Sequence, residues 1–212
     1  MFVACNHFSL SDPIHVLYSV PRQLAFLGKK ELFGNKLFGG VLSAFGAVPI
    51  DREKAGIGSM RTCVNIVKEG KGLLVFPEGT RNKDDDELMP FKGGVSVMAH
   101  MAKAPILPVL IYCRPRKFHR NYIVIGKPIC LDEYAGKPLK EEQIKEIDER
   151  LRNEMLALKE QVPQKFRERY ERNREKIYAK YRKKEERKRL KKERKLLKKQ
   201  KIEARKGKKE QD

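Results

Sequence analysis

Residues 6–12 of the chain read Asn-His-Phe-Ser-Leu-Ser-Asp and lie between an apolar run at 2–5 and Pro13. His7 and Asp12 are five positions apart, which on an α-helix would turn their side chains roughly 140° from each other. The backbone between them must therefore bend if the two side chains meet. Asp followed by Pro is typical of a helix start, because Asp is a good N-cap and Pro is favoured at the first helical position. The stretch predicts a strand over 2–5, a loop from His7 and a helix from Pro13.

This strand–loop–helix arrangement allows the Asp12 carboxylate to reach back to the His7 imidazole. A histidine held by a carboxylate at one ring nitrogen presents the other nitrogen as a general base. The alternative is that Asp12 only caps the helix and His7 is an ordinary polar loop residue. The residues further along the chain decide between these two interpretations.

The periodicity of the following residues predicts an α/β domain. Apolar runs of strand length alternate with segments whose apolar residues recur at helical spacing, which favours a largely parallel sheet covered by helices. We expect strands at 2–5, 24–27, 46–50, 73–76, 105–111 and 122–126. Helices are expected from 13 to near 21, from 35 to about 45, over 60–67, over 93–102 and over 144–158.

Charge divides the 212 residues into two parts. Residues 163–212 contain 24 Lys and Arg against nine Asp and Glu, a net charge of +15, whereas residues 1–162 carry only +5. We therefore expect a domain at 1–162 and a basic tail at 163–212. A sparse apolar stripe in the tail, formed by Phe166, Tyr170, Ile177 and Tyr181, predicts one helix that frays into a solvated segment after Tyr181. Such a tail favours an anionic partner.

The four cysteines are widely separated, which predicts reduced thiols and neither a zinc site nor a disulfide framework. No apolar run approaches the roughly 20 residues that cross a bilayer. No signal peptide pattern opens the chain.

Further polar residues follow the predicted strands. Lys29 follows the second strand, Arg52 the third, and Glu78-Gly79-Thr80-Arg81 the fourth. Sites of α/β domains lie at the carboxyl ends of the strands. Gly79 permits a tight turn, and the planar guanidinium of Arg81 suits a phosphate. Cations beside a His–Asp pair predict a site for an anionic substrate whose hydroxyl is activated.

Four motifs occur in order over residues 2–130: Asn6-His7-x4-Asp12, Gly46-x3-Ile50-Asp51-Arg52, Phe76-Pro77-Glu78-Gly79-Thr80-Arg81 and Ile106-Leu107-Pro108-Val109. Together they resemble the four-block signature of the lysophospholipid acyltransferase family. Within it, the 1-acylglycerol-3-phosphate acyltransferases are the most similar members. The resemblance implies a single glycerolipid-acyltransferase-type α/β domain, with the basic helical tail lying outside the family pattern.

The resemblance also implies roles for residues. His7 would be the general base for the acceptor hydroxyl, oriented by Asp12, and the hydroxyl would attack an acyl thioester directly. Residues that would hold the glycerol phosphate are Lys29, Arg52, Glu78, Gly79, Thr80 and Arg81, while Pro108 and Val109 would shape the wall of the acyl site. No metal or cofactor is implied. Acyl-CoA or acyl-carrier protein would be the co-substrate, and lysophosphatidic acid the acceptor.

Two alternatives remain for the function. The acceptor could be glycerol 3-phosphate or another lysolipid. A different class of function is a truncated, inactive relative whose tail binds membrane or RNA. Family members normally carry an N-terminal membrane segment, yet here the chain opens six residues before His7. We therefore expect either that the sequence is a fragment or that membrane attachment occurs by other means. In the second case the protein would be peripheral at the cytoplasmic face, held to an anionic membrane by its tail. No specific nucleic acid partner is expected.

Overall fold

The computed structural model describes residues 1–50, 57–83, 87–116 and 118–209. The chain divides into two compact units, Met1–Pro163 and Gln164–Asp212. The first unit contains a six-stranded sheet with the strand order β3-β2-β4-β1-β5-β6. The strands are β1 (Phe2–Cys5), β2 (Leu24–Lys29), β3 (Ala47–Ile50), β4 (Gly72–Val75), β5 (Ile106–Ile111) and β6 (Ile123–Ile125).

The prediction of a largely parallel sheet is confirmed. β1 to β5 pair in parallel, and only β6 is antiparallel to its neighbour β5. The described residues between β5 and β6, 112–116 and 118–122, form no helix, and such a short connection returns the chain antiparallel. β1 lies between β4 and β5, so all four of its residues are buried. The predicted strands match the observed ones to within one or two residues.

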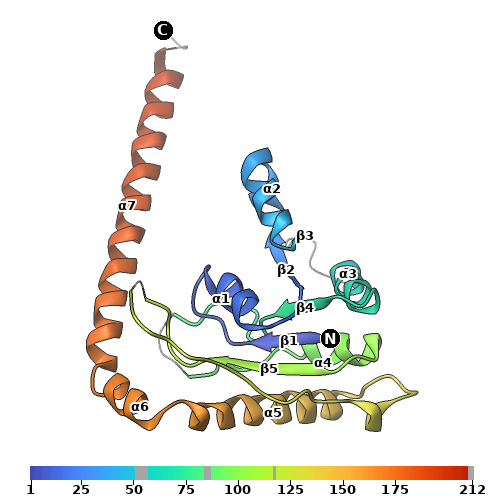
Figure 1. The fold of residues 1–212 in the computed structure, drawn as a ribbon. Coiled ribbons are helices and arrows are strands. Elements are labelled where there is room, and N and C mark those ends of the chain that lie inside the picture. Colours follow the sequence, from blue (N-terminus) through green and yellow to red (C-terminus); the bar gives the residue numbers. More distant parts are fainter. Residues whose placement is uncertain (51–56, 84–86, 117, 210–212) are drawn as a thin grey trace. The chain divides into compact units, whose positions relative to one another are not determined.

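The first unit contains helices on both faces of the sheet, as Figure 1 shows. Phe2, Leu73 and Ile106 point to one face and pack in a core with residues of α3 (Ile57–Lys68), α4 (Gly94–Ala102) and α5 (Glu141–Ala157). Val3, Leu74 and Val109 point to the other face and pack against Val16 of α1 (Asp12–Ser19). This alternation along each strand is the ordinary consequence of the β pleat. The helices of the unit are α1 (Asp12–Ser19), α2 (Lys36–Ala44), α3 (Ile57–Lys68), α4 (Gly94–Ala102) and α5 (Glu141–Ala157), with short 3-10 helices at Lys30–Phe33, Asp132–Tyr134 and Leu158–Gln161.

The start of α1 differs from the prediction by one residue. The helix begins at Asp12 and its N-cap is Ser11, which makes no side-chain cap hydrogen bond. Asp12 is therefore not the cap, and Pro13 lies in the first turn. The carboxylate of Asp12 is engaged with the residues before the helix, as described below.

Over its described residues, 164–209, the second unit contains two helices, α6 (Gln164–Glu171) and α7 (Arg174–Lys209). The predicted single apolar stripe is therefore wrong. Phe166 and Tyr170 stack on α6 with ring centroids 6.4 Å apart, whereas Ile177 and Tyr181 belong to α7. The expected fraying after Tyr181 is also absent from the described residues, since α7 continues to Lys209. Ion pairs between successive turns, such as Glu185 with Lys188, support the helix there.

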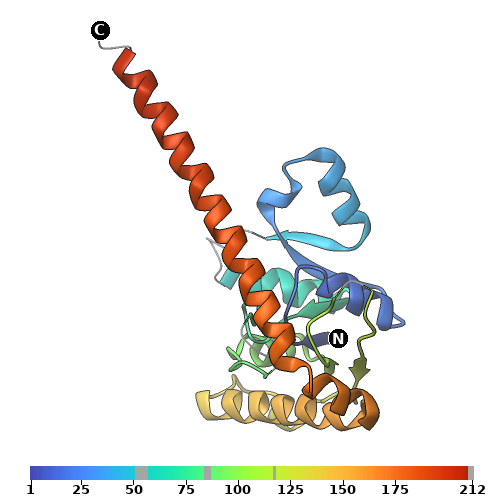
Figure 2. The same cartoon turned by 90° about the vertical axis from the view of Figure 1, so that its left-hand side faces the viewer.

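No described helix has the length and apolar character that crossing a membrane requires. Several exposed apolar side chains of the first unit gather at two of its helices. Leu10, Ile14 and Tyr18 lie in and before α1, and Leu37, Val41 and Phe45 in and after α2, with Tyr18 95% exposed. Figure 2 shows α2 standing away from the sheet beyond β2 and β3.

Candidate active site

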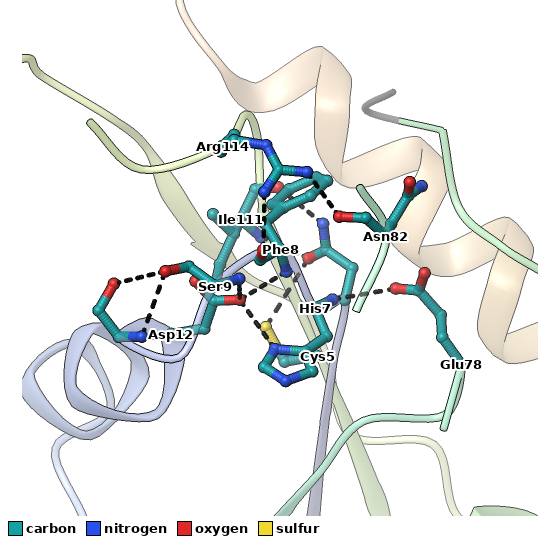
Figure 3. Close-up of polar contacts among 11 residues, drawn as sticks. Cys5, His7, Phe8, Ser9, Asp12, Glu78, Asn82, Ile111 and Arg114 are labelled. Carbon is teal, nitrogen blue, oxygen red and sulfur yellow. Dashed lines mark hydrogen bonds and ion pairs between the residues drawn. The ribbon is translucent and has the colours of Figure 1, made fainter. Parts of the chain in front are cut away.

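Three loops meet where the central strands of the sheet end. β4, β1 and β5 are neighbours and run parallel, so their carboxyl ends lie at the same edge. His7 follows β1, Glu78 follows β4 and Arg114 follows β5. Polar groups distant in sequence therefore meet here (Figure 3), at the place where α/β domains bind ligands.

The structure brings His7 and Asp12 together as predicted. Nδ1 of His7 lies 2.9 Å from Oδ2 of Asp12. The same oxygen accepts hydrogen bonds from the main-chain N–H groups of Phe8 at 2.6 Å and Ser9 at 2.7 Å. Asp12 is completely buried, and the His7 side chain is 15% exposed. Because an ionised carboxylate only accepts hydrogen bonds, Nδ1 is the donor and Nε2 carries the free lone pair in the neutral ring.

The contacts of Asp12 rule out the interpretation that it only caps the helix. Its three hydrogen bonds go to the ring of His7 and to the main chain of Phe8 and Ser9, all of which precede α1. Its other oxygen, Oδ1, is buried without a hydrogen-bond partner among the described residues. The carboxylate therefore organises the loop that carries His7.

The ring and main chain of His7 are fixed from further directions. The imidazole stacks on Phe76, with centroids 3.9 Å apart and planes at 18°. The His7 N–H donates to Oε1 of Glu78 at 3.0 Å, and the His7 carbonyl accepts from the N–H of Asn82 at 2.7 Å. One residue earlier, the Asn6 amide pairs with both main-chain groups of Ile111. The imidazole is thereby held in one orientation.

Glu78 differs from its predicted role at the phosphate. Its side chain is only 1% exposed, and its two oxygens accept from the N–H groups of His7 and Met89. Burial raises the pKa of Glu78 to about 7, against the hydrogen bonds from these two N–H groups, which lower it. A buried acceptor that faces His7 is unsuited to bind an anion. Its observed contacts are with the main chain of His7 and Met89.

The turn that follows Glu78 is open to solvent. Gly79 has a φ of +66°, a conformation that favours glycine, and a Cβ atom there would lie within 3 Å of the Lys92 side chain. Gly79, Thr80 and Arg81 are all exposed. Lys29 is also exposed and is the last residue of β2, next to β4. No described residue forms a hydrogen bond or ion pair with the side chains of Lys29 or Arg81.

Two other predicted residues lie within β5, and a third, Arg52, lies outside the described residues. Pro108 and Val109 are both buried within β5, and Val109 packs in the core beneath α1 with no exposed surface. Val109 is therefore a core residue in this structure, and its side chain is not accessible to an acyl chain. None of the four cysteines, all of which are described, forms a disulfide, and the described part of the chain contains no cluster of His, Cys, Asp or Glu that could hold a metal ion.

Sequence reasoning missed Arg114, Asn82 and Lys92 as parts of this site. Arg114 is 5% exposed and donates to main-chain carbonyls in both the His7 loop and the segment after β4. The sequence does contain a signal for Arg114, because it directly follows the apolar run of the fifth strand. Lys29 and Arg81 have comparable positions relative to their own strands. Lys92 adds a cation next to Gly79.

A separate hollow of about 510 Å³ lies at the opposite edge of the sheet. It is lined by the end of α4, the residues before β5 and the segment 130–138. His7 and the residues around it do not line this hollow.

Comparison with known proteins identifies the family. The family described as Acyltransferase matches residues 1–112, more than half of the chain. This chain belongs to that acyltransferase family. The resemblance drawn from the four motifs is therefore confirmed.

Individual relatives of this acyltransferase carry a more specific name. The 1-acyl-sn-glycerol-3-phosphate acyltransferase of Bacillus subtilis (strain 168) is 34% identical over 166 residues, covering 70% of this chain and 81% of that protein. The enzyme of the same name from Streptococcus pneumoniae (strain ATCC BAA-255 / R6) is 32% identical, covering 74% of this chain and 60% of that protein.

A solved structure is similar as well. The crystal structure of the 1-acyl-sn-glycerophosphate (LPA) acyltransferase PlsC from Thermotoga maritima matches with a TM-score of 0.57 and 26% identity. The match covers 75% of this chain and 66% of that chain. It supports the acyltransferase fold described above.

Proposed function

We propose that this acyltransferase transfers a fatty acyl group from an acyl thioester to the free hydroxyl of 1-acyl-sn-glycerol 3-phosphate, giving phosphatidic acid. The observation that carries the proposal is the contact of 2.9 Å between His7 Nδ1 and the buried Asp12 carboxylate. It leaves Nε2 as a base at the edge of the sheet where exposed cations also lie. The names of the bacterial relatives support the choice of acceptor.

The chemistry follows from the tautomer of His7. Nε2 removes the proton of the acceptor hydroxyl as its oxygen attacks the thioester carbonyl. The buried Asp12 carboxylate stabilises the imidazolium that forms. The tetrahedral intermediate then collapses, the C–S bond breaks, and the departing sulfur takes the proton from Nε2. No acyl-enzyme forms. Acyl-CoA or acyl-carrier protein is a co-substrate, and the proposed reaction uses side chains without a metal or cofactor.

The exposed turn after β4 suits the acceptor phosphate. Arg81 presents a planar guanidinium that can make two parallel hydrogen bonds to phosphate oxygens. Gly79 keeps the turn narrow, and Lys92 lies beside it. Lys29 and Thr80 are exposed at the same edge of the sheet. Because these side chains carry positive charge or a hydroxyl, they complement an anionic headgroup close to the base.

The direct test is an acyl-transfer assay with purified protein in detergent or vesicles. Lysophosphatidic acid, glycerol 3-phosphate and lysophosphatidylcholine are offered separately, each with acyl-CoA and with acyl-carrier protein as donor, and lipid products are identified by mass spectrometry. We expect phosphatidic acid to form fastest, and to form with at least one donor. Faster acylation of either other acceptor would contradict the proposed substrate.

We propose further that the protein works as a peripheral protein at the cytoplasmic face of an anionic membrane. Residues 163–212 have a net charge of +15, and each basic residue near an anionic surface contributes about 1 kcal/mol of attraction. Separately, Leu10, Ile14 and Tyr18 offer exposed apolar surface beside the His7 loop. Basic residues together with apolar side chains are typical of proteins that lie on a membrane.

Vesicle sedimentation tests this attachment. Binding should require anionic lipid, weaken as salt rises, and decrease when the chain is cut after Pro163, at the boundary of the two units. Since the chain contains no Trp, Tyr18→Trp gives a reporter without background, and its emission should shift to the blue on vesicles. Equal binding to neutral vesicles, or full binding after the cut, would exclude the tail as the anchor.

A further inference from the structure

Arg114 lies behind the candidate active site at a fixed point of the fold. It follows β5 by three residues, and the chain around it is tied to the start of β6. The N–H of Tyr112 donates to the Tyr122 carbonyl, and the Asn121 side chain bonds to the main chain of Cys113. The guanidinium is thus presented from a rigid strand end, although only 5% of the residue is exposed.

The guanidinium joins two loops that are distant in sequence. Nη1 donates to the Phe8 carbonyl at 2.8 Å, and Nη2 donates to the Asn82 carbonyl at 2.6 Å. The guanidinium carbon also lies 5.6 Å from the centre of the Phe8 ring. Figure 3 shows Arg114 between these partners. Two nitrogens in one plane therefore fix the spacing between the loop of His7 and the segment that begins with Arg81.

The contacts continue from Arg114 to the base through a single peptide group. The Phe8 carbonyl that accepts from Arg114 belongs to the same peptide as the Ser9 N–H, which donates to Oδ2 of Asp12 at 2.7 Å. That oxygen contacts Nδ1 of His7. Hydrogen bonds in series polarise one another, so a cation at the carbonyl end strengthens the bond at the N–H end.

A second path runs through the neighbouring peptide. Asn82, whose carbonyl accepts from Arg114, donates its own N–H to the His7 carbonyl at 2.7 Å. The His7 carbonyl and the Phe8 N–H belong to one peptide group, and that N–H donates to Oδ2 of Asp12. Both peptides that present N–H groups to Asp12 are thus held at their carbonyl ends, one by Arg114 directly and the other through Asn82.

We propose that Arg114 is a positioning residue for the His7–Asp12 pair. It touches neither substrate nor the reacting atoms. It holds the peptides that orient Asp12, and it keeps the His7 loop in register with the turn that carries Arg81. The inference rests on the proposed function, because it assigns the loop that Arg114 holds to the general base.

Lysine cannot replace this arrangement. A lysine keeps the charge and can reach one carbonyl, but its ammonium is a single point and lacks the planar fork that spans both acceptors. Arg114→Lys should therefore fold and lose catalytic rate. Displacement of a catalytic group by about 1 Å can cost on the order of 10²-fold in rate. We expect a loss of that size in kcat, with a smaller change in KM for the thioester.

A chemical rescue distinguishes positioning from general support of the fold. Arg114→Ala should lose kcat and recover part of it when guanidinium chloride is added at millimolar concentration, with sodium chloride as the salt control. Arg22→Ala is the matched variant, since Arg22 also donates to a main-chain carbonyl, that of Gly70, but at the opposite edge of the sheet. Arg22→Ala should keep its kcat and show no response to guanidinium.

A second readout does not depend on activity. The chain has four histidines, so labelling histidine with ¹⁵N gives a simple spectrum in which the Nδ1–H of His7, bonded to Asp12, is identified by its loss in His7→Ala. In Arg114→Lys this signal should broaden or vanish while circular dichroism is unchanged. Wild-type kcat and an unaltered His7 signal in Arg114→Lys would overturn the inference. If wild-type protein transferred no acyl group, the proposed function would fail, and the spectrum would still report on Arg114.

Discussion

Two loops at the carboxyl edge of the sheet differ in how firmly they are held. In the loop after β1, the ring of His7, its N–H and its carbonyl all have partners, and Asp12 is completely buried. In the turn after β4, Thr80 and Arg81 point into solvent. A general base needs one orientation before the substrate arrives, because its rate contribution depends on geometry. A cation that binds a phosphate can stay hydrated until the ligand replaces the water.

The largest effect should come from the firmly held loop. His7→Ala removes the base, and positioned bases contribute about 10²–10⁴-fold. We expect kcat to fall by that factor while the fold is retained, since the Asp12 carboxylate keeps its hydrogen bonds from the N–H groups of Phe8 and Ser9. Initial rates with saturating donor and acceptor measure the effect. A variant that retained more than a tenth of the activity would mean that another group accepts the proton.

Glu78 tests whether a buried carboxyl supports the same loop. The pKa of Glu78 is about 7 in the folded protein and near 4.5 in the unfolded chain. Between pH 4.5 and 7 the folded protein therefore holds a proton on Glu78 that the unfolded chain has released. The free energy of unfolding should therefore fall by up to about 3 kcal/mol as the pH rises from 4.5 to 7. Glu78→Gln should lack this part of the pH dependence.

Urea unfolding of both proteins at several pH values measures the difference. Parallel curves for wild type and Glu78→Gln would show that Glu78 does not titrate as described. The variant should also lose activity, because an amide can accept only one of the two N–H groups, those of His7 and Met89, that now meet the carboxyl.

A smaller effect is expected in the exposed turn. Arg81→Lys retains the charge and loses the second parallel hydrogen bond to phosphate. A hydrogen bond to a charged group contributes about 1.5–3 kcal/mol, so the acceptor KM should rise roughly ten- to a hundredfold. The thioester KM should be nearly unchanged. Equal losses toward acceptors with and without a phosphate would exclude Arg81 as the phosphate ligand.

The features that could be predicted from sequence are those that depend on neighbouring residues in the chain. The strands could be predicted because β1, β4 and β5 are continuous apolar runs. The contact between His7 and Asp12 could be predicted because their five-residue spacing before Pro13 requires a turn. Exposed residues of the turn after β4 were predicted by type and position. Each of these signals is local.

The side-chain contacts that sequence reasoning did not find depend on burial, which local sequence does not determine. Glu78 is adjacent to Gly79 in the chain, yet its carboxylate turns inward to His7 while the next three residues face solvent. Arg114 follows an apolar run in the sequence, but its contacts with the His7 loop depend on the pairing of β5 with β1. The tail helix was predicted as continuous because the spacing of its aromatic residues gives no sign of the break between Glu171 and Arg174.

The central claim is that His7 and Asp12 act as one catalytic unit, and a double-mutant cycle tests it most directly. The kcat of wild type, His7→Ala, Asp12→Asn and the double variant is measured under saturating substrates, with circular dichroism as the control for folding. Groups that act as a unit have strongly non-additive effects. We predict that each single variant loses most of the activity and that the double variant is no slower than His7→Ala. Full activity of Asp12→Asn, or losses that multiply in the double variant, would contradict the account.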